Sequence, residues 1–185
     1  MKSKYTISIF TEDRIGLLNR ITIIFTRRHI NIESITASVT EIRGIYRYTI
    51  VVYVTNEVVK KLIGQIDKQI EVLKTFYHLS IDLVSREIAL YKISTEALKE
   101  NELFSRIINE NHAQILTFSK DFIIVEKTGD EHDIIKLFHE LEKFGMLEFV
   151  RSGKVAITKP MKTLSAYLRE LENNSNKTIK HFNKN

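Results

Sequence analysis

The sequence predicts an α+β fold in which one βαββαβ unit occurs twice. The first observation behind this prediction is a repeated order, because β-rich and helical segments alternate in the same way in both halves of the chain. The second is that the helical segments carry single apolar stripes, each of which needs a sheet to cover. The third is length, because 185 residues accommodate two domains of about 80 residues each.

Residues 1–80 contain the first unit. Segments rich in β-branched and aromatic residues predict four strands, at 4–11, 30–40, 44–55 and 71–80. Two helices are predicted between them, at 16–29 and 56–70. Apolar residues recur three and four positions apart in both helices, namely Leu18, Ile21 and Phe25, and Val59, Leu62 and Ile66. Each helix therefore has one face to bury.

Residues 86–159 repeat this order. Strands are predicted at 86–94, 112–119, 121–129 and 146–158, and helices at 95–111 and 130–144. The second of these helices has its stripe at Ile134, Leu137 and Leu141. Thr95 and Asp130 are predicted helix caps, because a short polar side chain can accept hydrogen bonds from the free amides of a first turn.

Right-handed crossovers convert each unit into a four-stranded antiparallel sheet with both helices on one face, the ferredoxin-like sandwich. The opposite face of each sheet is then expected to be bare. Apolar side chains such as Ile50, Val52 and Val54 are expected on exposed edge strands, where they favour pairing with another copy of the chain. The boundary at residues 80–86 contains no Gly/Pro linker, so we expect the two domains to pack against each other.

The composition is that of a globular protein, with 43% hydrophobic and 28% charged residues. The absence of cysteine excludes disulfides, thiolate metal sites and cysteine catalysis, and it is compatible with a reducing compartment. The N-terminus lacks the apolar core of a signal peptide, and no apolar run is long enough to span a bilayer. These features predict a soluble, cytoplasmic protein.

The net charge of +5 is unevenly distributed along the chain. Basic and acidic residues number 12 and 8 in residues 1–85, 10 and 13 in residues 86–158, and 6 and 2 in residues 159–185. Much of the excess therefore lies at the C-terminal end, where residues 160–185 are predicted to form a basic tail with a short helix and a polar end. A solvated tail accounts for the charge without a nucleic-acid partner.

A turn and a strand start in the first unit could together bind an amino acid. Asp13 and Gly16 lie between the first predicted strand and helix, where free backbone amides can hold a carboxylate and Asp13 can attract an ammonium group. Asn31 adds a donor and an acceptor, and apolar surface comes from Ile15, Leu17 and Leu18. The residues alone also allow a purely structural role, in which Asp13 caps the helix, Gly16 eases the turn and Asn31 makes a local bond.

The segment EDRIGLLNRITIIFTRRHINIESIT, residues 12–36, resembles the beginning of an ACT domain. Its end, RRHINIESIT, resembles the regulatory small subunit of acetolactate synthase, also called acetohydroxyacid synthase. The family pattern is matched at Glu12, Gly16, Leu18, Arg20, Asn31, Ile32, Glu33 and Ser34. The segments REIALYKI and FVRSGKVAITK also resemble the family, so the similarity covers roughly residues 4–159.

This resemblance implies a regulatory subunit of branched-chain amino acid biosynthesis that has no catalytic residues, metal or cofactor of its own. Such subunits bind a large catalytic subunit, a transferase that carries thiamine diphosphate, magnesium and FAD. They raise its activity and confer allosteric feedback inhibition by a branched-chain amino acid, with valine as the family default. The family's effector site lies between the ACT domains of a homodimer, which implies effector-binding roles for Asp13, Ile15, Gly16, Leu17, Leu18, Asn31 and Ile32.

Asp13 departs from the family pattern, which usually has Asn at this position. A carboxylate there favours the ammonium group of an amino acid and repels its carboxylate, so the effector's identity and the sensitivity to it stay open.

Other functions have less support in the sequence. The six histidines form no set with metal-ligand spacing, and His132 and His139 are expected on a solvated helix face. No catalytic triad, phosphate-binding loop or nucleotide fingerprint is present. RNA binding by the βαββαβ plan needs aromatic residues beside a basic sheet face, whereas the second half is acidic. A stand-alone amino-acid-sensing ACT protein that regulates another enzyme is the main alternative.

Overall fold

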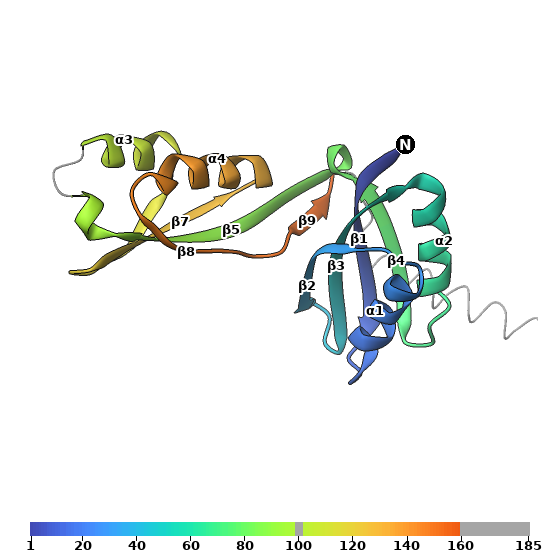
Figure 1. Ribbon diagram of the computed structural model, residues 1–185. Coiled ribbons are helices and arrows are strands. Elements are labelled where there is room, and N and C mark those ends of the chain that lie inside the picture. Colours follow the sequence, from blue (N-terminus) through green and yellow to red (C-terminus); the bar gives the residue numbers. More distant parts are fainter. Residues whose placement is uncertain (99–101, 160–185) are drawn as a thin grey trace, which may run out of the picture.

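The computed structural model describes residues 1–98 and 102–159, which form two antiparallel sheets, each with two helices on one face (Figure 1). One long strand, β5, runs from the first sheet to the second (Figure 1). The predicted pair of ferredoxin-like units is confirmed by this arrangement. Within the described ranges, every helix is too short or too polar to cross a bilayer.

The first sheet has the strand order β2-β3-β1-β4. Its strands are β1 (Lys2–Glu12), β2 (Ile32–Val39), β3 (Ile45–Thr55) and β4 (Val72–Leu79). Its helices are α1 (Leu17–Arg27) and α2 (Asn56–Ile66). Ile50, Val52 and Val54 lie on β3, which is a central strand, and all three are buried. The prediction that these residues lie on an exposed edge is therefore wrong, and the edges are β2 and β4.

The first core lies between this sheet and its two helices. Ile7 and Ile9 of β1 pack in the same cluster as the α2 stripe predicted from the sequence. The predicted α1 stripe is wrong at one position, because Leu18 is 39% exposed and Leu17 is fully buried. The helix begins at Leu17, and this start turns Leu17 rather than Leu18 toward the sheet, in line with Ile21 and Ile24.

The second sheet has the strand order β6-β7-β5-β8, with β9 paired to β5. Its strands are β5 (Leu83–Ser94), β6 (Gln114–Phe118), β7 (Phe122–Gly129), β8 (Met146–Arg151) and β9 (Val155–Thr158). The helical elements are two short 3-10 helices, η1 (Ser80–Asp82) and η2 (Thr95–Leu98), with α3 (Glu102–Glu110) and α4 (Glu131–Glu142). The division of the chain into domains at residues 80–86 stays a prediction, and this segment forms η1 and the start of β5.

The helix starts show which polar residues act as caps. The Asp130 carboxylate accepts a hydrogen bond from the Asp133 amide at 2.9 Å, which confirms the predicted cap of α4. Thr95, the other predicted cap, is the first residue of η2, and its hydroxyl donates to the Lys120 carbonyl. The single helix predicted at 95–111 is η2 followed by α3, with residues 99–101 outside the described part. Thr55, which the sequence reading missed, caps α2 by accepting from the Val58 amide.

The last predicted strand, 146–158, is two strands that pair with different parts of β5. Residues 89–93 of β5 pair with β8, and residues 83–86 pair with β9. The chain bends between them at Ser152, where the Ser152 amide donates to the Ile88 carbonyl and the Ser152 hydroxyl accepts from the Ile88 amide. Ser152 thus remains hydrogen-bonded to Ile88 of β5 between the two strands.

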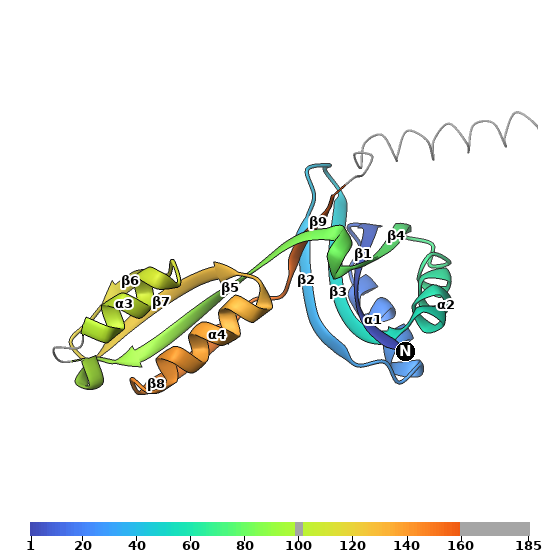
Figure 2. The same ribbon diagram turned by 90° about the horizontal axis from the view of Figure 1, so that it is seen from above.

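The outer face of the first sheet, away from its helices, is covered rather than bare as predicted. Figure 2 shows β9 beside β2 and β3. The Arg47 guanidinium of β3 donates to the Ser8 hydroxyl at 3.0 Å and to the Ala156 carbonyl of β9 at 2.6 Å. Ala156 is only 2% exposed. On the second sheet, by contrast, Ile88 and Val150 remain exposed.

Gly153 marks the tightest point of this contact. A Cβ atom at Gly153 lies 2.3 Å from the Thr36 hydroxyl oxygen and 3.1 Å from the Ile35 carbonyl oxygen of β2. Real Cβ atoms essentially never approach another heavy atom as closely as the 2.3 Å to Thr36, so only glycine fits here without a shift of the backbone.

We predict that Gly153→Ala lowers the free energy of unfolding by about 1–3 kcal/mol, because the added methyl group collides with β2. Urea unfolding measures this change. The matched control is Gly64→Ala on α2, where an added Cβ meets nothing within 4 Å and alanine favours the helix. A second substitution, Thr36→Ala, removes the colliding oxygen and is expected to restore part of the loss. Equal stability of the two glycine variants contradicts the proposed contact.

Candidate functional site

The turn between β1 and α1 presents an open backbone surface. Gly16 precedes the helix with a φ of 81°, a left-handed conformation that favours glycine. A Cβ built on Gly16 meets nothing within 4 Å, so the space beside this backbone is open. The turn is held by the Asp13 amide, which donates to the Gly44 carbonyl at 2.9 Å. A ligand can therefore approach the start of α1 closely.

The side chains around this turn differ in what they can contact. Gly16 is the N-cap of α1 and no side chain caps the helix, so the alternative in which Asp13 caps α1 is wrong. Asp13 is exposed at the turn. Ile15 is fully exposed at 105%, and Leu18 is also exposed, whereas the Leu17 side chain lies in the first core. The surface at Gly16 therefore combines uncapped helix amides, one carboxylate and two apolar side chains.

Asn31 lies at the opposite end of α1. It follows the helix, directly precedes β2 and is exposed. It lines a hollow of about 470 Å³ together with Arg28, Tyr53 and Val58. Ile32, next along the chain, is partly buried against the first core. Asn31 therefore presents its amide at the surface, while Ile32 anchors the start of β2.

Gly16 and Asn31 do not meet within one chain. The 11 residues of α1 separate them, and at about 1.5 Å per residue this helix is about 16 Å long. A free amino acid cannot span this distance. One chain therefore holds two partial surfaces, one at each end of α1.

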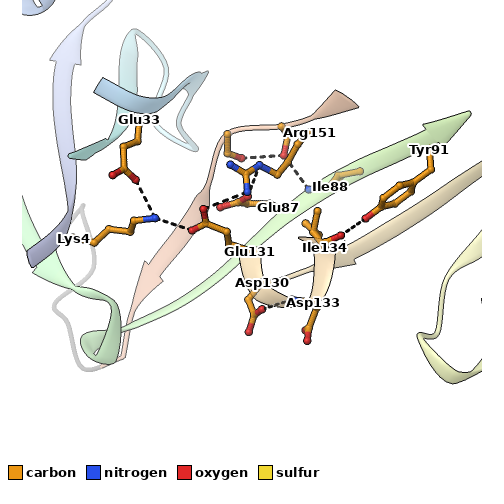
Figure 3. Close-up of polar contacts among 12 residues, drawn as sticks. Lys4, Glu33, Glu87, Ile88, Tyr91, Asp130, Glu131, Asp133, Ile134 and Arg151 are labelled. Carbon is orange, nitrogen blue, oxygen red and sulfur yellow. Dashed lines mark hydrogen bonds and ion pairs between the residues drawn. The ribbon is translucent and has the colours of Figure 1, made fainter. Parts of the chain in front are cut away.

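A chain of ion pairs connects the start of β2 to the second sheet (Figure 3). The Lys4 ammonium lies 3.0 Å from the Glu33 carboxylate on β2 and 2.8 Å from the Glu131 carboxylate on α4. Arg151 of β8 continues the chain, at 3.4 Å from Glu131 and 3.3 Å from the buried Glu87 of β5. The sequence reading missed this network, because Lys4 and Glu131 are 127 positions apart and no local pattern joins them.

The pKa values of these groups reflect their pairing. Burial lowers the pKa of Lys4, but its hydrogen bonds with Glu131 and Glu33 outweigh this effect and leave the pKa raised. The hydrogen bond from Lys4 lowers the pKa of Glu131. Burial raises the pKa of Glu87, and attraction by Arg151 opposes this. The charged forms of Lys4 and Glu131 therefore stabilise each other across the junction.

One exposed group of possible metal ligands occurs in the part of the chain that the structure describes. Oxygen or nitrogen atoms of Asp130, His132 and Asp133 lie within 4.8 Å of one another at the start of α4. All three residues are exposed, and the Asp130 carboxylate already accepts the Asp133 amide. This arrangement is sufficiently explained by helix capping.

The RNA-binding alternative needs aromatic side chains on an open sheet face. In the first sheet the outer face lies against β9, and Tyr48 is buried in the core on the helix side. Of the three tyrosines on β3, only Tyr53 is exposed, at 53%, and a single ring does not form the stacking surface that this alternative needs.

Comparison with known proteins identifies relatives along both sheets. Residues 7–74 match a family model described as the AHAS small subunit-like ACT domain, and residues 86–160 match one described as the small subunit of acetolactate synthase. The chain is 39% identical over 157 residues to the acetolactate synthase small subunit of Bacillus subtilis, covering 84% of this chain and 91% of that protein. It is 35% identical over 156 residues to the probable acetolactate synthase small subunit of Archaeoglobus fulgidus, covering 84% and 97% of the two chains.

A solved structure has the same fold. The crystal structure of the acetolactate synthase small subunit from Thermotoga maritima matches with a TM-score of 0.78 at 24% identity. The match covers 86% of this chain and 99% of that one, so both sheets are included.

We predict that Lys4→Met destabilises the protein at neutral pH and that this deficit disappears in acid. Partly exposed ion pairs of this kind contribute about 0.2–1 kcal/mol each. Because the pKa of folded Glu131 is lowered, its stabilisation is present above the unfolded pKa and is lost as the pH falls through the folded pKa. Urea unfolding of both proteins between neutral and acidic pH measures the difference. Lys60→Met, at an exposed position of α2, is the control, and a deficit for Lys4→Met that is independent of pH contradicts the pairing.

Proposed function

The chain belongs to the family of acetolactate synthase small subunits, and on this basis we propose that it activates a catalytic large subunit and confers feedback inhibition by a branched-chain amino acid. The observation that carries the proposal is the similarity along both domains, with 39% identity to a relative of this name over 84% of the chain. The match of the second domain to the small-subunit model favours this role over a stand-alone ACT protein. Thiamine diphosphate, magnesium and FAD are proposed to belong to the catalytic partner, not to this chain.

We place the effector site between two copies of the first domain. Gly16 and Asn31 are at opposite ends of the 11-residue helix α1, so a small ligand can contact both only if they come from different chains. β2 begins directly after Asn31 and is an edge strand of the first sheet. Its exposed Ile35 and Val39 offer apolar surface to a second copy. A homodimer through this edge brings the start of α1 in one copy near the start of β2 in the other.

The two partial surfaces complement the groups of a free amino acid. The uncapped start of α1 at Gly16 suits a carboxylate, since helix amides and the helix dipole both attract negative charge. Asp13 suits the ammonium group, and Ile15 and Leu18 suit an aliphatic side chain. Asn31 supplies a donor and an acceptor from the second copy. Valine is one methylene smaller than leucine and isoleucine, a difference worth about 1–3 kcal/mol, and the latter two differ only in where the chain branches. These contacts therefore indicate a branched-chain amino acid without specifying which one.

The first test of this function is a titration of the cognate large subunit with the purified chain. We expect the chain alone to form no acetolactate from pyruvate, and the turnover of the large subunit to rise to a plateau as the chain is added. The reason is that binding to the active state of the large subunit shifts its population toward that state. Turnover that stays constant through a full titration of two folded proteins contradicts the proposed role.

The second test concerns the effector residues. We predict that Gly16→Asp abolishes valine binding, because its side chain fills the open space at the start of α1 and its charge repels the ligand carboxylate. Asn31→Ala is expected to weaken binding by about 1–3 kcal/mol through the loss of a desolvated hydrogen bond. Calorimetry of the full chain measures both effects.

Two controls carry the same chemical changes away from the site. Gly64→Asp places the same charge on α2, and Asn109→Ala removes an exposed amide from α3. Both are expected to bind valine as the unmodified chain does. If Gly16→Asp and Asn31→Ala bind valine as tightly as their controls, the effector site lies elsewhere.

A further inference from the structure

A groove of about 910 Å³ lies where the starts of β5 and β9 meet the first half of α4. Five lysine and arginine side chains line it, against two carboxylates, those of Asp130 and Glu131. His132 and His139 lie along the same wall. The groove contains none of the residues of the proposed effector site, so the two are separate surfaces.

Both carboxylates of the groove already have partners. Glu131 is paired with Lys4 and Arg151, and Asp130 accepts the amide of Asp133. Neither is therefore available to neutralise the remaining cations that line the groove. The local electrostatic field favours an anion.

Lys154 is the least satisfied of these cations. It lies just before β9, and only 8% of the residue is exposed. Among residues 1–98 and 102–159 its ammonium has no hydrogen bond or ion pair, and Glu87 attracts it only from beyond ion-pair distance. A lysine stem can be buried while its charged tip reaches an opening, and Lys154 lines the groove.

The backbone around Lys154 fixes this position. Gly153, the preceding residue, lies tightly against Thr36 of β2, and Val155 after it pairs with Arg86 of β5. Lys154 thus lies between a residue packed against β2 and a residue paired with β5. The arrangement is built into the junction and does not depend on a mobile surface side chain.

Other cations reach the groove from different elements. Arg86 of β5 uses one guanidinium nitrogen on the Ser85 carbonyl, which leaves further donors free to contact a ligand. Lys136 of α4 has only a 3.8 Å pairing with Glu140 one turn away. Val84 and Ile135 are exposed on the same walls and add apolar surface. The groove combines converging positive charge with an apolar patch.

We propose that this groove binds a small phosphorylated molecule, with Lys154 and Arg86 as the principal contacts to phosphate. Lysine ammonium groups bind phosphate as point charges, and the arginine guanidinium adds directional donors. A volume of about 910 Å³ is within the range of small-molecule sites. The ligand contacts β5, the segment before β9 and α4 at once, so its binding is expected to stabilise their junction.

Calorimetric titration of the full chain with inorganic pyrophosphate tests this site, and it needs no large subunit. The result is therefore independent of the proposed regulatory function. We expect saturable binding that Lys154→Met weakens about tenfold or more, as loss of a charged hydrogen bond predicts. Methionine keeps a similar volume in the buried stem position. Arg86→Gln, at an exposed side chain, is expected to weaken binding in the same direction.

The controls separate this groove from general attraction to a basic chain. Lys60→Met removes an exposed charge from α2 and is expected to leave pyrophosphate binding unchanged. No binding at millimolar pyrophosphate overturns the proposal. Binding that is equal in Lys154→Met, Arg86→Gln and the unmodified chain also overturns it, because the anion then binds elsewhere. If Lys154→Met does not fold, the affinity of Arg86→Gln relative to Lys60→Met decides the question.

Discussion

The arrangement of the two sheets depends on β5, because its two ends pair with different partners. Residues 87–94 pair with β7 and residues 89–93 with β8, inside the second sheet. Residues 83–86 pair with β9, which lies on the outer face of the first sheet through the bond from Arg47 to Ala156. A strand loses these bonds if either partner moves away, and buried backbone groups need their partners. These hydrogen bonds therefore link the second sheet to the outer face of the first.

The contact between the two sheets is made by charged residues near the proposed effector site. Glu33 is two residues from Asn31 and is joined through Lys4 to Glu131 on α4. The energy of an ion pair depends on the distance between the two charges, so a shift of β2 changes the interaction between Glu33 and Lys4. In the proposed function, the effector bound at Asn31 and the second domain are thus connected by charged contacts. Such a connection between two sites is what allosteric coupling requires, provided that the effector favours one of two states.

The sequence predicted the features that depend on local periodicity. The stripes on α2 and α4 and the cap at Asp130 follow from spacing and side-chain chemistry alone. Leu17 and Leu18 could not be distinguished in this way, since adjacent leucines fit the same period and only the start of the helix selects the buried one. The break at Ser152 and the cover over the first sheet depend on pairing with distant residues. Nothing local indicates either one.

The candidate site was predictable in part. Gly16 indicated an open turn, and the structure has the left-handed backbone that such a glycine permits. The separation of Gly16 and Asn31 also follows from the length of the intervening helix. The ion pair from Lys4 to Glu131 and the groove around Lys154 could not be predicted, because each joins residues from both halves of the chain.

The central claim is that one effector site needs two copies, and valine binding by mixed dimers of Gly16→Asp and Asn31→Ala tests it most directly. In a re-associated equal mixture, half of the dimers pair one copy of each variant and regain one intact site, so we predict about a quarter of the unmodified chain's sites at its affinity. A mixture that binds no more valine than the two variants measured separately contradicts the claim.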